Sequence, residues 1–480
     1  MPNPIIHTNP GERIVTFFST QRLYDVLPAA YNSLLAFNPD VQVYCFIEDD
    51  NLPYKTPANV HTVNVTGQTF FPQDGPCFRT KYTYMILLKT ALTKIFPDAS
   101  KALILDVDTI TCADLSPLWE WDLSHAYYAA VIEPEGSRIR QYPYANFGVV
   151  MLNLDKLRTS GKDDLIIQEL NTTFHQYPEQ DAFNKICMNR FDPLPPEYNV
   201  TYPGFNITGH AERTVVRHFA GYNDWSDFEI VQYWTTHTTP PPRYVVYAGD
   251  KRVKNMVIAS AKSFLAHNTA EKIFFLTDGW TTDEPLPPII ETIDVSNQTI
   301  FPPSCPNIIP WYGYMTTLRA ALTEVLPLSV ERVLWLDPDT IVMDDISDIW
   351  NNDLQRYYFA AVEEVRNNNH THKPYFNAGV MLMNLKKLAE DGKAIEIINE
   401  INHTRYEHLE QDVLNFLCFH HILKLPSKYS DSYVSEPSAH PLIHHYLAND
   451  KKNFYPAAKP YDIPWNELKG VIQYGQRNGK

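Results

Sequence analysis

Short apolar stretches alternate with amphipathic stretches along most of the chain. The pattern predicts a strand at residues 14–18, a helix that continues to residue 34, and a second strand around residues 41–46. The same order returns at residues 244–248, a helix to about residue 265, and residues 273–276. Short buried strands that alternate with helices predict an α/β fold whose mostly parallel sheet is wrapped by helices.

Two of the apolar strands end directly in a pair of acids. LILDVDTI (103–110) contains Asp106 and Asp108, and VLWLDPDTI (333–341) contains Asp337 and Asp339. The surroundings recur as well, with VTGQTFFP (65–72) returning as VSNQTIFP (295–302) at an offset of 230 residues. At an offset of 231, YANFGVVMLNL pairs with YFNAGVMLMNL and PEQDAFN pairs with LEQDVLN. So many matches in fixed register indicate a tandem duplication.

The duplication sets the expected domain organisation. Copy one is expected over residues 1–235 and copy two over residues 243–458. The segment between them, 236–242, contains three prolines and is expected to be a stiff linker. Residues 459–480 are expected to form a C-terminal tail that packs on the surface or frays.

Composition and charge narrow the classes of function. The 480 residues suffice for two or three domains with buried cores, and 44% of them are hydrophobic. The net charge of −16 argues against nucleic acid as the main partner, although it leaves room for one small basic groove.

The cysteines and the apolar stretches of the sequence indicate the cellular compartment of the protein. The six cysteines form no CxxC pair, which indicates buried free thiols in a reducing compartment. The first residues lack a signal-peptide pattern, and no apolar run approaches the roughly 18 residues of a membrane span. These features together predict a cytoplasmic protein without a membrane span.

The acid pairs suggest a metal site in each copy. At the carboxyl end of a parallel strand, two close carboxylates suit Mn²⁺ or Mg²⁺ shared with a phosphate group. For a single Asp-x-Asp motif, a turn or a helix cap is the simpler explanation. Because the motif recurs in matching surroundings, a metal site becomes the preferred explanation. A histidine late in each copy, His218 and His445 (with His444 beside it), could complete an Asp/Asp/His site that favours Mn²⁺.

Two further motifs accompany each acid pair. Asn146 and Gly148 in copy one, and Asn377 and Gly379 in copy two, precede an apolar strand. The glycine permits close approach of the backbone, and the asparagine could bind a sugar hydroxyl or simply close a turn. An EQD motif then begins a helix in both copies, where acids are also favourable as N-terminal residues.

The ordered set of motifs resembles the retaining family 8 glycosyltransferases, the group of glycogenin and the bacterial lipopolysaccharide galactosyltransferases. The set consists of a strand, an Arg-bearing helix, LDxDT, N-x-GV, QD and a histidine, and it covers nearly the whole chain twice. The resemblance implies two tandem GT-A domains, a nucleotide-diphosphate sugar donor, most often a UDP-sugar, and a divalent cation, usually Mn²⁺.

The resemblance also implies roles for individual residues. The metal ligands would be Asp337, Asp339 and His445 in copy two, and Asp106, Asp108 and His218 in copy one. The donor would be bound by Ala248, Asp250, Asn377, Gly379 and Arg319 in copy two, and by Asn146, Gly148 and Lys89, which stands at the place of Arg319, in copy one. Residues beside the reacting carbon or the diphosphate would be Gln411, Asp412 (or Glu410) and Lys451, and Gln180 and Asp181 (or Glu179).

Each copy departs from the family pattern. Copy one has Thr20 where copy two has Asp250, and Asp224 where copy two has Lys451. An acid at that place would repel a diphosphate unless Arg79 or Lys81 compensates. Copy two has Val253 in place of the usual base-stacking aromatic residue, near whose place copy one has Tyr24, and Ala448 in place of a glycine. These differences favour copy two as the more competent donor site.

The sequence therefore predicts a metal-dependent retaining glycosyltransferase that acts on a glycan, protein or other hydroxyl acceptor. Three alternatives stay open. The enzyme could be bifunctional; one copy could be a pseudo-domain for acceptor binding or for formation of a homodimer; or the chain could bind sugar nucleotides or glycans without turnover. A glycosidase is disfavoured, because adjacent acids cannot flank one sugar at roughly 5–10 Å.

Overall fold

The structure is a computed structural model, and it describes residues 3–478 except 202–206, 209–210, 212, 222, 283, 311–312, 367–373 and 448–449. The chain divides into two compact units, residues 1–241 and 242–480. No helix within the described ranges is long and apolar enough to cross a membrane.

The first unit contains ten strands and eight α-helices among its described residues. The strands are β1 (Ile14–Ser19), β2 (Gln42–Ile47), β3 (Val60–Asn64), β4 (Lys101–Leu105), β5 (Thr109–Thr111), β6 (Tyr128–Ile132), β7 (Ala145–Asn153), β8 (Asp192–Pro193), β9 (Val200–Thr201) and β10 (Val216–His218). The α-helices are α1 (Leu27–Phe37), α2 (Leu92–Ile95), α3 (Ser116–Glu120), α4 (Pro134–Arg140), α5 (Leu154–Ser160), α6 (Lys162–Thr172), α7 (Pro178–Ile186) and α8 (Glu229–Thr236). Two 3₁₀ segments matter below, η2 (Tyr84–Ala91) and η3 (Pro196–Asn199).

The second unit repeats this order over its described residues. Its strands are β11 (Tyr244–Gly249), β12 (Lys272–Thr277), β13 (Ile290–Asp294), β14 (Arg332–Leu336), β15 (Thr340–Val342), β16 (Phe359–Glu363), β17 (Phe376–Asn384), β18 (Ile422–Leu425) and β19 (Ile443–His445). Its α-helices are α9 (Lys254–His267), α10 (Leu322–Val325), α11 (Leu385–Glu390), α12 (Lys393–His403), α13 (Leu409–Leu417), α14 (Phe454–Ala458) and α15 (Lys469–Asn478), and its 3₁₀ segment η5 (Thr317–Ala321) corresponds to η2.

Each unit is built on a seven-stranded sheet of the same topology. The strand orders are β3-β2-β1-β4-β7-β6-β8 and β13-β12-β11-β14-β17-β16-β18. All neighbouring strands pair in parallel except β7 and β17, which run antiparallel to both of their neighbours. The expected α/β fold with a mostly parallel sheet in each half is thus confirmed, with one reversed strand in each sheet.

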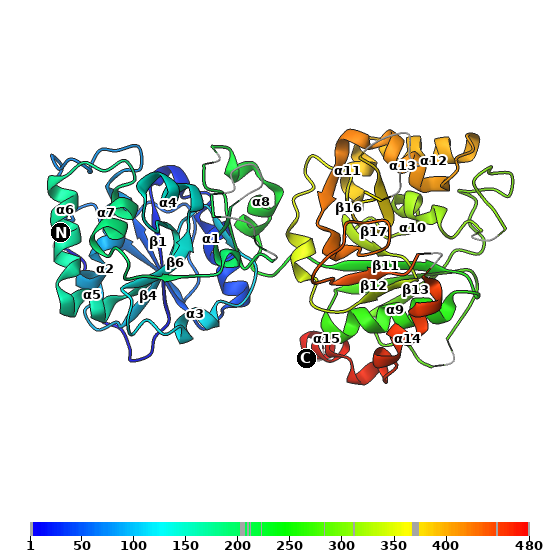
Figure 1. Ribbon diagram of the computed structural model, residues 1–480, viewed down its shortest axis with the longest axis horizontal. Coiled ribbons are helices and arrows are strands. Elements are labelled where there is room, and N and C mark those ends of the chain that lie inside the picture. Colours follow the sequence, from blue (N-terminus) through cyan, green and yellow to red (C-terminus); the bar gives the residue numbers. More distant parts are fainter. Residues whose placement is uncertain are drawn as a thin grey trace. The chain divides into compact units, whose positions relative to one another are not determined.

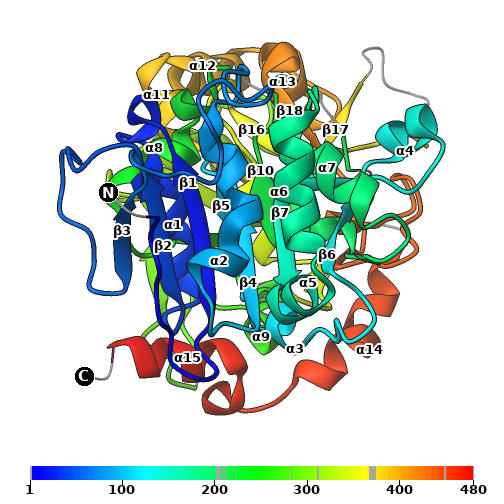
Figure 2. The same cartoon turned by 90° about the vertical axis from the view of Figure 1, so that its left-hand side faces the viewer.

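Helices cover both faces of each sheet, which explains the continuous apolar runs in the sequence. In β4, Leu103 and Leu105 pack toward α1 and α8, whereas Ala102 and Ile104 pack toward η2, α2 and α5 to α7. Figure 2 shows this second set of helices in front of the sheet of the first unit. In the second unit, α9 and α15 lie on one side of β11 to β13 and α10 to α13 lie on the other (Figure 1).

The C-terminal residues form a helix that packs against α9. Lys469 donates a hydrogen bond from Nζ to the carbonyl of His267 at 3.1 Å. Gly470 lies so close to α9 that an added Cβ would come within 2.1 Å of the carbonyl oxygen of Asn268. Residues 469–478 are therefore part of the packed second unit.

Candidate metal and donor site

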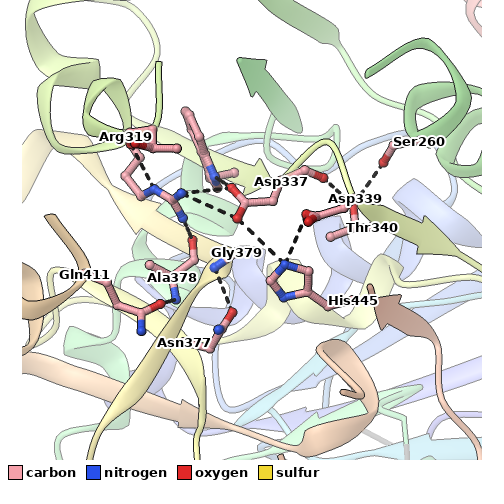
Figure 3. A network of polar contacts seen from close by, with 12 residues as sticks. Ser260, Arg319, Asp337, Asp339, Thr340, Asn377, Ala378, Gly379, Gln411 and His445 are labelled. Carbon is pink, nitrogen blue, oxygen red and sulfur yellow. Dashed lines mark hydrogen bonds and ion pairs between the residues drawn. The ribbon is translucent and has the colours of Figure 1, made fainter. Parts of the chain in front are cut away.

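The reversed strand and a small second sheet bring the motifs of the second unit together. Asp337 follows β14, and its backbone N–H donates to the carbonyl of Gly379 on β17 at 2.8 Å. After the acid pair, β15 pairs antiparallel with β19, so that Thr340 lies opposite His445. Three motifs spread over residues 337–445 thus meet at one edge of the sheet (Figure 3).

The two acids and the histidine form a compact triad. Nε2 of His445 lies 3.3 Å from Oδ1 of Asp339 and 3.8 Å from Oδ2 of Asp337. One ligand atom from each of these residues can be chosen so that all lie within 4.8 Å of one another. Two carboxylates and one imidazole are a ligand set that suits Mn²⁺ or another divalent cation.

Gly379 makes room for the imidazole of His445. A Cβ at this position would lie 2.1 Å from Cε1 of the ring and 2.7 Å from each ring nitrogen. Gly148 has the same relation to His218, with Cε1 at 2.1 Å. The glycine of each N-x-G motif therefore gives the histidine ring the room to lie this close to the reversed strand.

The first unit assembles the corresponding triad. Nε2 of His218 lies 3.3 Å from Oδ1 of Asp108 and 3.8 Å from Oδ2 of Asp106. His218 lies opposite Thr109 in the antiparallel pair of β10 and β5. The distances match those of the second unit, so both copies present a complete Asp/Asp/His set.

Electrostatics couple each histidine to the second acid of its pair. Burial raises the pKa of the Asp108 carboxyl, but His218, a backbone hydrogen bond and Lys89 together lower that pKa by more, so the net shift is downward. Burial likewise lowers the pKa of His218, and the carboxylates of Asp108 and Asp106 together raise it by more. The pKa values of Asp339 and His445 are shifted in the same directions, and at Asp339 the ammonium group of Lys451 adds to the lowering by His445. Carboxylates that stay charged beside an imidazole fit a divalent cation.

Arg319 lies behind the triad of the second unit. From η5 its guanidinium makes an ion pair of 3.1 Å with Oδ1 of Asp337 and another of 3.1 Å with Glu410, and Nη1 donates to the carbonyl of Ala378. The residue is 4% exposed. Arg319 therefore fixes the position of Asp337, the first acid of the pair. Burial raises the pKa of Glu410 by more than the charge of Arg319 lowers it, so the net shift is upward.

Lys89 takes the place of Arg319 in the first unit. Its Nζ lies 2.7 Å from Oδ1 of Asp106, 3.0 Å from Oε1 of Glu179 and 3.3 Å from the carbonyl oxygen of Phe147. An ammonium group has three N–H donors, and these three acceptors occupy all of them. A guanidinium has five donors, so Arg319 retains capacity that Lys89 lacks.

A cleft of about 190 Å³ adjoins the acid pair of the second unit. Ala248 and Asp250, at the carboxyl end of β11, line it together with Asp337, Asp339 and Lys451. Nζ of Lys451 lies 3.2 Å from Oδ2 of Asp339. Asp250 is bound by Arg252 at 2.5 Å and faces the cleft, and Val253 lines the same wall. The strand ends, the acids and a lysine thus share one cavity.

The asparagine and glutamine of each copy are joined by a glutamate that sequence reasoning missed. Oε1 of Glu364 accepts from Nδ2 of Asn377 at 2.9 Å and from Nε2 of Gln411 at 3.2 Å. Oε1 of Glu133 accepts from Asn146 at 2.7 Å and from Gln180 at 3.1 Å. The two glutamates stand at the same offset of 231 residues, and this coincidence of acids was the signal that could have found them.

Hydrogen bonds fix both ends of the Gln411 amide, and the neighbouring Asp412 binds groups at the start of its own helix and just before β17. Oε1 of Gln411 accepts from the backbone N–H of Ala378 at 2.8 Å. Asp412 accepts from Oη of Tyr375 at 2.6 Å and from the N–H of His408 at 2.8 Å. In the first unit, Gln180 accepts from Phe147 N–H at 2.9 Å, and Asp181 accepts from Oη of Tyr144 at 2.5 Å and from Arg140 at 2.9 Å. Both aspartates, Asp412 and Asp181, thus accept hydrogen bonds from neighbouring residues of their own unit.

The first copy departs from the family pattern after β1 and after β10. Thr20 directly follows β1 and precedes a 3₁₀ turn. Oη of Tyr24 accepts from the N–H groups of Glu48 and Asp49 at 3.0 and 3.2 Å. Asp224 begins a short 3₁₀ turn after His218. Ala448 lies outside the described residues.

Comparison with known proteins agrees with this geometry. The family model described as glycosyl transferase family 8 matches residues 28–227 and 281–451. A putative glycosyltransferase of Haemophilus influenzae is 26% identical over 196 residues, which are 36% of this chain and 58% of that protein. Glycosyltransferase GlyE of Streptococcus pneumoniae is 27% identical over 253 residues, which are 47% of this chain and 57% of that protein.

A solved structure of galactosyltransferase LgtC in complex with donor and acceptor sugar analogues is 21% identical, with a TM-score of 0.36 over 48% of this chain and 99% of that one. The chain spans just over half the length of the two curated relatives. Because the family model covers more than half of the chain and matches both units, the chain belongs to glycosyl transferase family 8 and contains two tandem GT-A domains.

Proposed function

We propose that the protein is a metal-dependent, retaining glycosyltransferase that moves a sugar from a nucleotide-diphosphate donor, a UDP-sugar, to a hydroxyl group of a glycan, a protein or another acceptor. The observation that carries the proposal is the Asp337/Asp339/His445 triad, which adjoins the cleft that Asp250 and Lys451 line. The six buried free thiols suit the reducing cytoplasm as its location.

Asp337, Asp339 and His445 would hold a divalent cation, Mn²⁺ or Mg²⁺, which supplies positive charge to the donor diphosphate. Lys451 is 43% exposed at its side chain and can turn from Asp339 to a phosphate oxygen, to which it would donate a charge-assisted hydrogen bond. Arg319 keeps Asp337 in place through an ion pair of 3.1 Å, and its guanidinium has more N–H donors than an ammonium group. These residues together stabilise the charge of the departing diphosphate.

Gln411 fits a positioning role better than that of a nucleophile. Its amide is fixed by the N–H of Ala378 and by Glu364, and an amide oxygen is a weak nucleophile. The bond between the sugar carbon and the phosphate oxygen would break as the acceptor oxygen bonds to the same face of the sugar. The acceptor proton would pass to the departing phosphate oxygen, so the donor itself supplies the base and configuration is retained.

The second unit is proposed as the more competent donor site. It combines Asp250, Lys451 and an arginine with unused donors, whereas the donors of Lys89 are all occupied in the first unit. A bifunctional enzyme is the second candidate, and the complete triad in both units favours it. A pseudo-domain for acceptor binding or dimerisation is the alternative for the first unit.

The test is release of UDP from a panel of UDP-sugars in the presence of Mn²⁺, for the unaltered chain and for Asp337→Asn and Asp106→Asn separately. We expect Asp337→Asn to lower turnover by about a hundredfold or more, since it removes a metal ligand. Asp344→Asn, which changes an exposed acid seven residues farther along, is the matched control.

The outcomes separate the candidates. Full activity in Asp337→Asn would overturn the preference for the second unit. Two donors consumed, each lost in only one variant, would establish the bifunctional enzyme. Metal-dependent binding of a UDP-sugar without release of UDP would instead support a binding protein.

A further inference from the structure

A hydrogen-bonded chain of side chains links the histidine of the first triad to Gln180. Nδ1 of His218 lies 2.9 Å from Oδ1 of Asn199, and Nδ2 of Asn199 donates to Oδ1 of Asn146 at 2.7 Å. Asn146 in turn donates to Glu133, which also accepts from Gln180. Asn199, at the end of η3, has no exposed surface.

One backbone group determines the orientation of both asparagine amides in this chain. The N–H of Gly148 can only donate, and it does so to Asn146 at 2.9 Å, so the accepting atom of Asn146 is its oxygen. Because the same oxygen lies 2.7 Å from Asn199, the atom of Asn199 that faces it is the NH₂ group. The oxygen of Asn199 is then the atom that faces His218.

That assignment fixes the form of the imidazole that can bind a cation. An amide oxygen accepts only, so the neutral ring of His218 carries its proton on Nδ1. Its lone pair is then on Nε2, the nitrogen that faces Asp106 and Asp108. Partners behind a metal-binding histidine that hold its tautomer typically change metal affinity by about 10–100-fold when they are removed.

The second unit lacks this link. Ser430 stands 231 residues after Asn199, at the corresponding place. Within the described part of the chain, neither Oγ of Ser430 nor Nδ1 of His445 has a hydrogen-bond partner, although both residues are buried to 1% exposure. Asn377 still accepts from Gly379 N–H and donates to Glu364, so only the connection to the histidine is missing.

We propose that Asn199 is a positioning residue that holds His218 in the tautomer whose Nε2 faces the cation, and that the change to Ser430 makes the two metal sites unequal. The first unit then has the better oriented histidine although it has the poorer donor cleft. The inference rests on the proposed binding of a divalent cation by the two triads, and it adds an unequal affinity that the motifs alone do not indicate.

The test measures the affinity for Mn²⁺ alone, by calorimetry and by electron paramagnetic resonance, in full-length chains that retain one site. Asp337→Asn leaves the first site, and Asp106→Asn leaves the second. We expect Asn199→Ser to weaken the first site by about tenfold or more, and Ser430→Asn to tighten the second site. The reciprocal variant keeps the inference falsifiable if Asn199→Ser does not fold.

A matched control separates tautomer positioning from local packing. Thr208 donates a hydrogen bond from Oγ1 to the backbone carbonyl of Asn199 at 2.5 Å. This bond involves the backbone of Asn199 and not the side-chain amide that faces the imidazole. Thr208→Val removes a bond to the same residue, and we expect it to leave the Mn²⁺ affinity unchanged. An equal loss in Thr208→Val and Asn199→Ser would overturn the positioning role.

Two further results would also overturn the inference, for different reasons. If the single-site parents bind Mn²⁺ and neither Asn199→Ser nor Ser430→Asn changes the affinity, the positioning role fails and the proposed function stands. If neither parent binds Mn²⁺, the proposed metal dependence fails and the inference falls with it.

Discussion

Gly379→Ala should disable the proposed metal site of the second unit while leaving its acids in place. The new Cβ would lie 2.1 Å from Cε1 of His445, whereas carbon atoms make contact at about 3.5 Å, so ring and strand must separate by about 1.4 Å. His445 cannot retreat easily, because its N–H donates to the carbonyl of Asp431 at 2.8 Å and its residue pairs with Thr340. The ring must therefore turn away from the acids.

The expected magnitudes follow from this displacement. Forcing a methyl group into a packed position costs about 1–3 kcal/mol, which corresponds to a fall of about 2–12 °C in the melting temperature of a unit of this size. A ligand moved by more than 1 Å no longer binds, so the affinity for Mn²⁺ should fall by at least about tenfold. The φ angle of Gly379 is not in the positive range, so an alanine causes no backbone strain there. The clash of the new Cβ with the ring therefore accounts for the expected loss.

The assay combines thermal unfolding without metal and Mn²⁺ titration in the Asp106→Asn background, which retains only the second site. Gly475→Ala is the control, because a Cβ there meets nothing within 4 Å and the helix should gain slightly in stability. An unchanged Mn²⁺ affinity in Gly379→Ala would refute the reasoning that the glycine exists to seat the histidine.

Three other predictions concern two substitutions and the reactivity of the cysteines. Lys451→Ala should weaken UDP binding with Mn²⁺ by about tenfold or more in calorimetry, because a charge-assisted hydrogen bond contributes about 1.5–3 kcal/mol, and the exposed Lys452→Ala should not. Asp163→Asn should lower the free energy of unfolding in urea at pH 7 by about 1–3 kcal/mol, since the carboxylate bonds Lys94 at 2.9 Å and Thr93 at 2.8 Å. Burial raises the pKa of Asp163 but Lys94 and Thr93 lower it by more, so this stability is present above the unfolded pKa of about 3.9 and is lost as the pH falls through the lower folded pKa; a difference that stays constant to pH 2 would contradict it. The six cysteines should react with a thiol reagent at pH 8 only in denaturant, because all are buried and burial raises the pKa of Cys187 and Cys418 to about 12; rapid labelling of the native chain would be the contrary result.

Much of the fold could be predicted from the sequence because its signals are local and are repeated. The expected strand at residues 14–18 is β1 (Ile14–Ser19), and the strand expected at residues 273–276 is β12 (Lys272–Thr277). Their apolar runs are continuous because helices cover both faces of the sheet. The segment before β4 was less regular than its pattern, since η2 is a 3₁₀ segment with an α-helical turn only at its end.

The reversed strand could not be predicted from periodicity, which is the same for parallel and antiparallel pairing. Yet the reversal of β7 and β17 places the start of each strand, with its N-x-G motif, at the edge where the neighbouring strand, β4 or β14, is followed by its acids. The close contact of Gly379 with His445 follows from this reversal. A parallel strand would have placed the motif at the opposite end of the sheet.

The sequence by itself determined the duplication, the family motifs and the acids, histidines, asparagines and glutamines of both copies, because residue identity and spacing are written in it directly. Only the tertiary structure decided which atoms meet: the buried place of Arg319, the saturated donors of Lys89, the bridging glutamates and the contact of Asn199 with His218. These contacts join segments up to about a hundred residues apart, and their geometry depends on strand direction and packing, which no local pattern encodes.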